Sequence, residues 1–194
     1  MKSYILFYKP YGVLSQFSQE SSHKALCDFG PFPKDIYAAG RLDADSEGLL
    51  FLTNDTVVNH RLTDPKFGHE RTYIVQVEGI PDNDDLALLS SGIMIGTKRT
   101  KPAVVRLIDN TPNFPERAVS IRFRKDIPTS WLEMTLREGR NRQVRKMTAA
   151  IGHPTLRLVR TSITFLTLKN LNPGEHRELT SEEIKKLYST LLLS

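Results

Sequence analysis

The feature that most constrains the fold of this chain is a succession of short runs rich in β-branched and aromatic residues. Several of these runs alternate apolar and polar side chains, which is the pattern of strands with one buried face. We predict strands at residues 3–8, 49–53, 72–78, 103–108, 118–124, 130–136, 155–160 and 163–168. Because most of them follow one another without a helix between, the sequence predicts an α+β fold with a mixed, largely antiparallel central sheet.

Three helices are predicted to flank this sheet. The first covers residues 84–91 and ends before Gly92, and the second covers residues 139–152. The third begins after Thr180, which can form a capping box with Glu183. Strands therefore outnumber helices in the predicted fold.

Composition indicates a globular protein. The chain has 194 residues, of which 39% are hydrophobic and 25% charged, enough for one domain spanning residues 1–194 or two fused halves. Cys27 is the only cysteine, which excludes an intramolecular disulfide and fits a reducing compartment. The first apolar run stops at Lys9 and Pro10, too early for a signal peptide or a membrane span. We predict a cytoplasmic protein without a membrane partner.

Positive charge is concentrated in one part of the chain. The net charge is +5, and residues 137–160 contain seven basic residues and one acid. This window therefore carries +6, and the rest of the chain carries −1. Such a concentration indicates a binding site for a polyanion, most often a nucleic acid, although a solvated basic face would have the same composition.

The predicted helix at 139–152 has two different faces. At about 100° per residue, one side is apolar and the other cationic. The apolar stripe consists of Val144, Met147 and Ile151, and the cationic side of Arg142, Arg145 and Lys146. This arrangement fits a helix that lines a phosphate-binding cleft, and it fits a basic surface helix equally well.

A loop at residues 40–48 combines Arg41 with three acids, Asp43, Asp45 and Glu47. A calcium loop is disfavoured, because its last two ligand positions would be phenylalanine and asparagine. The loop could be a solvated polar turn, or it could present a catalytic carboxylate that an arginine keeps ionised. The loop by itself does not decide between these two interpretations.

Six motifs in a fixed order give the chain a family resemblance. They are FYKPYGVLSQ at 7–16, GRLDADSEGLLFLTND at 40–55, HRLTDP at 60–65, RTYIVQVEG at 71–79, EGRNRQVRKM at 138–147 and LRLVR at 156–160. Together they resemble the RsuA-type pseudouridine synthases, which isomerise uridine to pseudouridine in ribosomal RNA. A single motif would be weak evidence for the family, but these motifs occur in the family's order and the resemblance covers nearly the whole chain.

The resemblance implies three catalytic residues. Asp43 stands in the place of the catalytic aspartate, which either attacks the ribose carbon or removes a ribose proton. Arg145 would keep this carboxylate ionised. Tyr73 would cover the uracil and help to remove its C5 proton. Leu158 and Val159 would form an apolar pocket wall that limits access of water to the detached base.

The resemblance also implies an RNA-binding cleft and a fold. The expected fold is that of the pseudouridine synthases, with two subdomains that share one sheet, a division near residues 60–70 and a basic catalytic cleft. The predicted RNA-binding residues are Lys9, Arg41, Arg140, Arg142, Lys146, Arg157 and Arg160. The isomerisation involves no redox step, and the chain lacks the Cys and His spacing of a metal site, so we expect no cofactor and no metal.

Two departures from the family pattern keep the charge: Arg71 stands where lysine is commoner, and Lys146 where arginine is commoner. Because the Lys-Pro motif begins at residue nine, we expect no N-terminal S4 RNA-binding module. The predicted substrate is 23S ribosomal RNA, free or in an assembling particle, and the predicted state is a monomer. The alternatives are transfer RNA, small-subunit ribosomal RNA, or a non-catalytic role in RNA binding or ribosome assembly.

Overall fold

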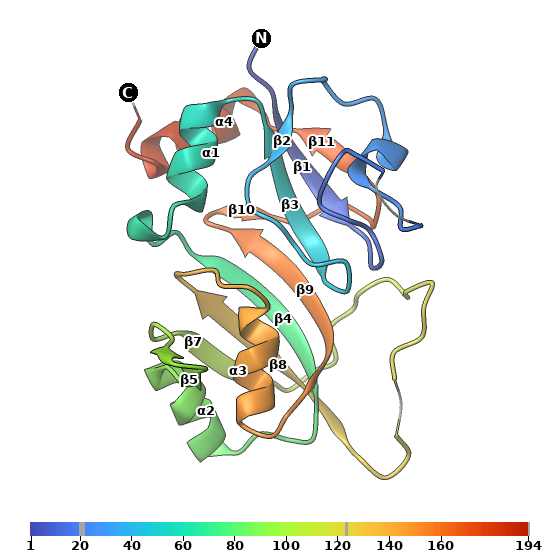
Figure 1. The fold of residues 1–194 in the computed structure, drawn as a ribbon, viewed down its shortest axis with the longest axis vertical. Helices are drawn as coiled ribbons and strands as arrows, with labels where there is room; N and C mark the ends of the chain where they lie inside the picture. Colours follow the sequence, from blue (N-terminus) through green and yellow to red (C-terminus); the bar gives the residue numbers. More distant parts are fainter. Residues whose placement is uncertain (20–21, 123, 194) are drawn as a thin grey trace. The chain divides into compact units, whose positions relative to one another are not determined.

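The chain forms two compact units (Figure 1). Unit 1 comprises Met1–His69 and Thr167–Ser194, and unit 2 comprises Glu70–Leu166. The structure, a computed structural model, describes residues 1–19, 22–122 and 124–193. Unit 1 is thus built from both ends of the chain, whereas unit 2 is one continuous segment.

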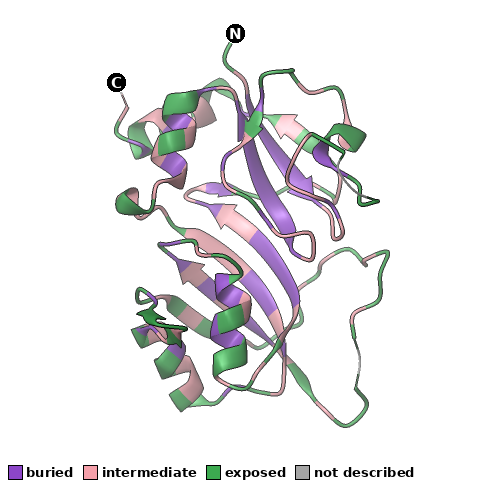
Figure 2. Ribbon diagram, viewed as in Figure 1, coloured by how far each residue is buried: buried purple, intermediate pink, exposed green. Residues whose placement is uncertain are grey.

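Unit 1 is built around two fully buried strands. Its strands lie in the order β11 (His176–Glu178), β1 (Tyr4–Lys9), β3 (Glu47–Thr53) and β2 (Tyr37–Ala38), each antiparallel to its neighbour. Every residue of β1 and β3 is buried, as the purple strands of Figure 2 show. A core cluster on one face contains Phe7 and Leu50, with Phe17 and Phe32 packed against it.

Two capped helices complete unit 1. They are α1 (Thr56–Thr63) and α4 (Ser181–Thr190), and the 3-10 turns Leu26–Phe29 and Pro65–Phe67 lie in its loops. Asp55 caps α1 by accepting hydrogen bonds from two backbone amides of the first turn. Thr180 and Glu183 form the predicted capping box of α4.

Unit 2 is an antiparallel sheet with helices on one face. The strand order is β9 (Thr155–Ile163), β4 (Arg71–Glu78), β8 (Thr129–Leu136) and β7 (Val104–Ile108). The helices are α2 (Asn83–Ser91) and α3 (Gln143–Ala150), and β5 (Met94–Ile95) pairs with β6 (Lys98–Arg99) in a small hairpin. Leu89 of α2 and Met147 of α3 join Val75 and Leu132 in one core cluster. The short β10 (Leu166–Thr167) spans the boundary between the units.

The predicted α+β class with a largely antiparallel sheet is confirmed. Strands occur at five of the predicted places, as β1, β3, β4, β7 and β8, and the first and third helices occur as α2 and α4. The two strands predicted at 155–160 and 163–168 are instead one long strand, β9, followed by the short β10.

Two predictions of secondary structure are wrong in part or whole. Residues 118–122 and 124 form no strand, and Phe123 lies outside the described residues. The second helix begins only at Gln143, because its N-cap residue Arg142 has a φ of 53°, in the left-handed region that a helix cannot include. The described part of the chain contains no helix long and apolar enough to cross a membrane.

Candidate active site

In unit 1, the loop between β2 and β3 carries Asp43 and is held through its backbone. The hydroxyl of Ser15 donates to the carbonyl of Leu42 at 2.7 Å and accepts from the amide of Leu42 at 3.0 Å. The carbonyl of Ala44 accepts from the amide of Gly12 at 2.7 Å. Asp43 is half-buried between these two fixed points. The sequence thus presents a carboxylate on a backbone whose position is set by the segment after β1.

Lys9 supports the same loop from inside. Its side chain is fully buried, and its ammonium group donates to three backbone carbonyls: Val13 at 2.6 Å, Pro10 at 3.1 Å and Ala44 at 3.5 Å. A buried ammonium group requires such acceptors. This structure gives Lys9 the role of positioning the loop, and its predicted contact with RNA stays a prediction.

Tyr73 lies in unit 2 among arginines. It is half-buried on β4, where it pairs with Arg160 of β9 and packs against the core cluster beneath α3. Burial lowers the pKa of Arg71; Tyr73 opposes this shift, and the positive charge of Arg160 adds to it. Two guanidinium groups beside one phenol form a local positive field that favours an anion, such as a phosphate group or a carboxylate.

Arg145 projects from α3, which packs its other face on the core. Val144 and Met147 are buried as predicted, and Lys146 is exposed. Arg145 is intermediate between these two environments, because it is half-buried and donates weakly to the carbonyl of Thr155 at 3.5 Å. A partly buried guanidinium is suited to pairing with a carboxylate, since its charge is less screened than at the surface.

Arg140 and Glu138 hold the turn before α3 to the β5–β6 hairpin. The guanidinium of Arg140 donates to the carbonyls of Arg99 at 2.7 Å and Lys98 at 3.4 Å, and lies 3.1 Å from Glu138. Glu138 is buried and also accepts from the side-chain amide of Gln143 at 2.7 Å. Arg140 thus fixes the start of the basic segment, in addition to its predicted role in RNA binding.

Arg157 is buried on the opposite face of the sheet from Arg160. Its guanidinium donates to the carbonyl of Pro115 at 2.9 Å and lies over the ring of Phe114, 5.4 Å from the centroid. These contacts anchor the long connection between β7 and β8. Arg157 therefore has a structural role here, and its direct contact with RNA stays a prediction.

Leu158 and Val159 lie on opposite faces of the sheet of unit 2. Side chains of successive strand residues point to opposite faces of a sheet. Leu158 pairs with Val75 and belongs to the core cluster beneath α3, whereas Val159 pairs with Ile74 on the other face. Leu158 is thus a core residue of unit 2, and the pocket wall of Leu158 and Val159 stays a prediction.

The remaining predicted site residues are placed as follows. Arg41, Arg142 and Lys146 are exposed, as residues that bind RNA would be. Asp43 belongs to unit 1, while Tyr73 and Arg145 belong to unit 2. The structure therefore brings Tyr73 and Arg160 together within one unit, and the pairing of Asp43 with Arg145 stays a prediction.

Sequence reasoning missed three residues that shape the site. Arg71 lies beside Tyr73 and Arg160, and Glu138 and Gln143 form the buried polar contact before α3. All three lie inside the motifs at 71–79 and 138–147, so the motifs pointed to them. The motifs did not show which of their residues hold other residues in place.

Comparisons with known proteins identify the family of the chain. The sequence profile described as RNA pseudouridylate synthase matches residues 3–150. Ribosomal large subunit pseudouridine synthase E of Vibrio parahaemolyticus is 52% identical over 175 residues, which are 90% of this chain and 73% of the relative. The protein of the same name from Xanthomonas campestris is 51% identical over 89% of this chain and 93% of its own length.

A solved structure supports the same assignment. A crystal structure of pseudouridylate synthase superposes with a TM-score of 0.80 at 30% identity, covering 96% of this chain and 74% of that one. The predicted resemblance, the predicted fold and the predicted class of enzyme are thereby confirmed. The chain belongs to the RNA pseudouridylate synthase family, whose members are isomerases acting on RNA.

Proposed function

We propose that this enzyme converts a specific uridine of 23S ribosomal RNA to pseudouridine, with Asp43 as the catalytic carboxylate. The observation that carries the proposal is the identity of 51–52% over nine-tenths of the chain to relatives named for the large ribosomal subunit. The motif GRLDADSEG, in which Asp43 lies, is part of the matched segment.

In the proposed reaction the uridine leaves its stack, because its reacting atoms are inaccessible inside a duplex. The bond between ribose C1′ and uracil N1 breaks, the base turns, and C1′ bonds to C5. C5 then loses its proton and N1 takes one up, so that the product is an isomer of the substrate. Asp43 starts this sequence from a loop that Ser15 and Lys9 hold in place. A carboxylate on a fixed backbone needs little reorganisation as charge develops on the sugar.

The cations of unit 2 are proposed to have two separate tasks. One keeps the carboxylate of Asp43 ionised, and the others increase the affinity for RNA. Arg145 would pair with Asp43 and keep it ionised, and Tyr73 would face the uracil ring. Arg142 and Lys146 are exposed and would contact phosphates that flank the target. Since flipping a base costs a few kcal/mol, such contacts offset part of it.

Pseudouridine mapping tests this proposal. Ribosomal and transfer RNA would be taken from cells that lack the protein and from the same cells after its gene is restored. We expect one position in 23S RNA to lose pseudouridine and to regain it on restoration. Loss at a position of transfer RNA or 16S RNA would redirect the substrate, and an unchanged map would contradict catalysis.

We further propose that the enzyme acts as a monomer in the cytoplasm. The single cysteine and the bacterial ribosome-directed relatives support this compartment. Light scattering after size-exclusion chromatography tests the monomer, with a mass near 22.1 kDa expected and a doubled mass contradicting it.

A further inference from the structure

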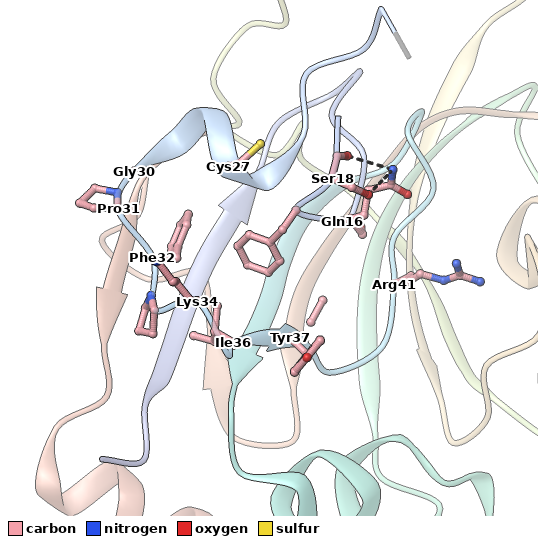
Figure 3. A pocket seen from close by; sticks show the side chains of 14 residues that line it. Gln16, Ser18, Cys27, Gly30, Pro31, Phe32, Lys34, Ile36, Tyr37 and Arg41 are labelled. Carbon is pink, nitrogen blue, oxygen red and sulfur yellow. Dashed lines mark hydrogen bonds between the residues drawn. The ribbon is translucent and has the colours of Figure 1, made fainter. Parts of the chain in front are cut away.

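Unit 1 contains a hollow beside the loop that carries Asp43, and of the predicted site residues only Arg41 lines it. It has a volume of about 590 Å³ and is lined by residues from 15–18 and 27–41 (Figure 3). Pockets of roughly 300–1,000 Å³ accept small ligands. Its floor is apolar and belongs to the core: Phe17 and Phe32 meet edge to face at 5.6 Å, and both pack against the core cluster of unit 1. The floor is therefore preformed.

The rim of the hollow has a different character. Tyr37 is 64% exposed, and Lys34 and Arg41 are exposed beside it. Within residues 1–19, 22–122 and 124–193, these three side chains form no hydrogen bond, ion pair or ring contact. The residues lining the hollow include two cations and no carboxylate. An exposed ring with adjacent cations is how proteins hold single-stranded nucleic acid.

The hollow and the catalytic loop share a backbone. Ser15 and Arg41 both line the hollow. Ser15 also makes the two hydrogen bonds that hold Leu42, the residue before Asp43. Arg41 is two positions before Asp43, so the hollow and the carboxylate are fixed to each other within unit 1.

We propose that this hollow is a stacking subsite for an unpaired base of the substrate RNA next to the isomerised uridine. Tyr37 is the stacking ring, and Lys34 and Arg41 face the flanking phosphates. This inference rests on the proposed function for the nature of the substrate. Because stacking reads the face of a base and not its edge, the subsite selects an unpaired strand without selecting a sequence.

Stacking of the neighbouring base on Tyr37 would also offset part of the cost of extruding the uridine. Extruding the uridine removes its stacking on both sides, and the base beside it then loses a partner. Tyr37 replaces that partner. The contact is made before and after isomerisation alike, so it affects binding and leaves the chemical step unchanged.

Kinetics of Tyr37 variants give the first test. The substrate is ribosomal RNA from cells lacking the protein, and the product is pseudouridine. We expect Tyr37→Ala to raise KM by about 5- to 150-fold, the range that base–aromatic stacking supplies, with kcat unchanged. Tyr37→Phe and Tyr37→Trp should retain the KM of the parent protein. Val57→Ala, which changes an exposed apolar residue of α1, is the matched control. An unchanged KM for Tyr37→Ala would overturn the proposal.

Photo-crosslinking gives the second test and separates the subsite from the proposed function. The probe is a single-stranded RNA of about twelve nucleotides that carries 5-iodouridine, which crosslinks to aromatic side chains that stack on it. We expect the crosslinked peptide to contain Tyr37. If the enzyme forms pseudouridine but the crosslink maps elsewhere, the subsite is wrong and the proposed function stands. If Tyr37 crosslinks but no pseudouridine forms, the subsite is supported and the proposed function fails.

Discussion

Unit 1 and unit 2 hold their charged side chains in different ways. In unit 1, Lys9 and Asp55 are buried, and each is surrounded by hydrogen-bond partners that stabilise its charge. In unit 2, the segment before and within α3 exposes Arg142 and Lys146. The difference indicates a division of labour between these two sets of charges, in which the buried charges of unit 1 fix a backbone and the exposed charges of α3 are proposed to attract RNA. Each prediction below changes one side of this comparison.

The largest effect is expected for Asp43, the proposed catalytic carboxylate of unit 1. Asp43→Asn should reduce pseudouridine formation more than about a thousandfold, because an amide can neither attack the sugar nor remove its proton. RNA affinity should stay within about tenfold, roughly 1.4 kcal/mol. Turnover and filter binding measure the two quantities on the same protein.

Asp45→Asn is the matched control for this variant, since it makes the same change two residues further along the loop. We expect it to keep activity within about tenfold. Parental turnover by the Asp43 variant, or equal losses in both variants, would remove Asp43 from the chemistry.

The second effect concerns the stability of unit 1. Asp55 accepts hydrogen bonds at 2.8 Å from Tyr4 and Tyr188, and its carboxylate lies 2.8 Å from the ammonium group of Lys2. Burial raises the pKa of this carboxyl, but the bonds from these groups and from the amide of Val58 outweigh burial, so the pKa lies well below its ordinary value of 3.8. One carboxylate thus ties β1, α1 and α4 together.

Asp55→Asn should therefore lower the free energy of unfolding at pH 7 by about 2–4 kcal/mol. Because the folded pKa is depressed, the contribution of the carboxylate is complete above pH 3.8 and is lost as the pH falls towards the folded pKa. The difference between parent and variant should thus shrink as the pH decreases below about 4. Urea unfolding at several pH values measures it, with Glu182→Gln, an exposed change on α4, as the control. A difference that grows in acid would contradict this account.

The third effect tests whether Lys9 positions the loop or contacts RNA. Lys9→Met removes the donor to three carbonyls and should cost about 2–3 kcal/mol of stability. We expect kcat to fall with it, because Ala44 loses one of its contacts beside Asp43. Lys34→Met, an exposed change in the same unit, should leave stability unchanged. A variant with parental stability and kcat but a raised KM would show that Lys9 binds RNA after all.

The sequence pattern predicted where most strands lie along the chain, but not which strands pair with one another in the sheet. Alternation at 118–124 resembled a strand, yet no partner strand is described beside it, and Val119 remains 55% exposed. Alternation indicates only that a segment fits a half-buried surface, and the surface itself must come from elsewhere in the fold. The helix α1 was not predicted, because only Val58 and Leu62 face the core over its two turns.

The candidate site shows the same limit. The motifs identified Asp43, Tyr73 and Arg145 as candidate catalytic residues, because a motif is a set of residue types in a fixed order and can be found without knowing the fold. The burial of Lys9 depends on carbonyls at Val13 and Ala44, up to 35 positions away, so its role required the fold. The alternation of side chains along a strand, by contrast, follows from the sequence once the strand is predicted, and it places Leu158 and Val159 on opposite faces of the sheet.

The smallest effect contrasts two arginines of unit 2. Arg142 is exposed and is proposed to contact a phosphate, whereas Arg157 is buried against Phe114 and Pro115. Arg142→Ala should weaken RNA binding by about threefold to tenfold and make the slope of log affinity against log salt shallower by about one, because one released counterion is lost.

Arg157→Ala should leave that slope unchanged and lower the melting temperature instead, since a side chain that donates to a carbonyl and covers a ring releases no counterion when RNA binds. Binding titrations at several salt concentrations, together with thermal melts of both variants, measure the two responses. If the salt slope falls equally in both, Arg157 reaches the RNA. Exposure would then fail to separate cations that bind RNA from cations that hold the protein, and contact with RNA would have to replace burial as the criterion.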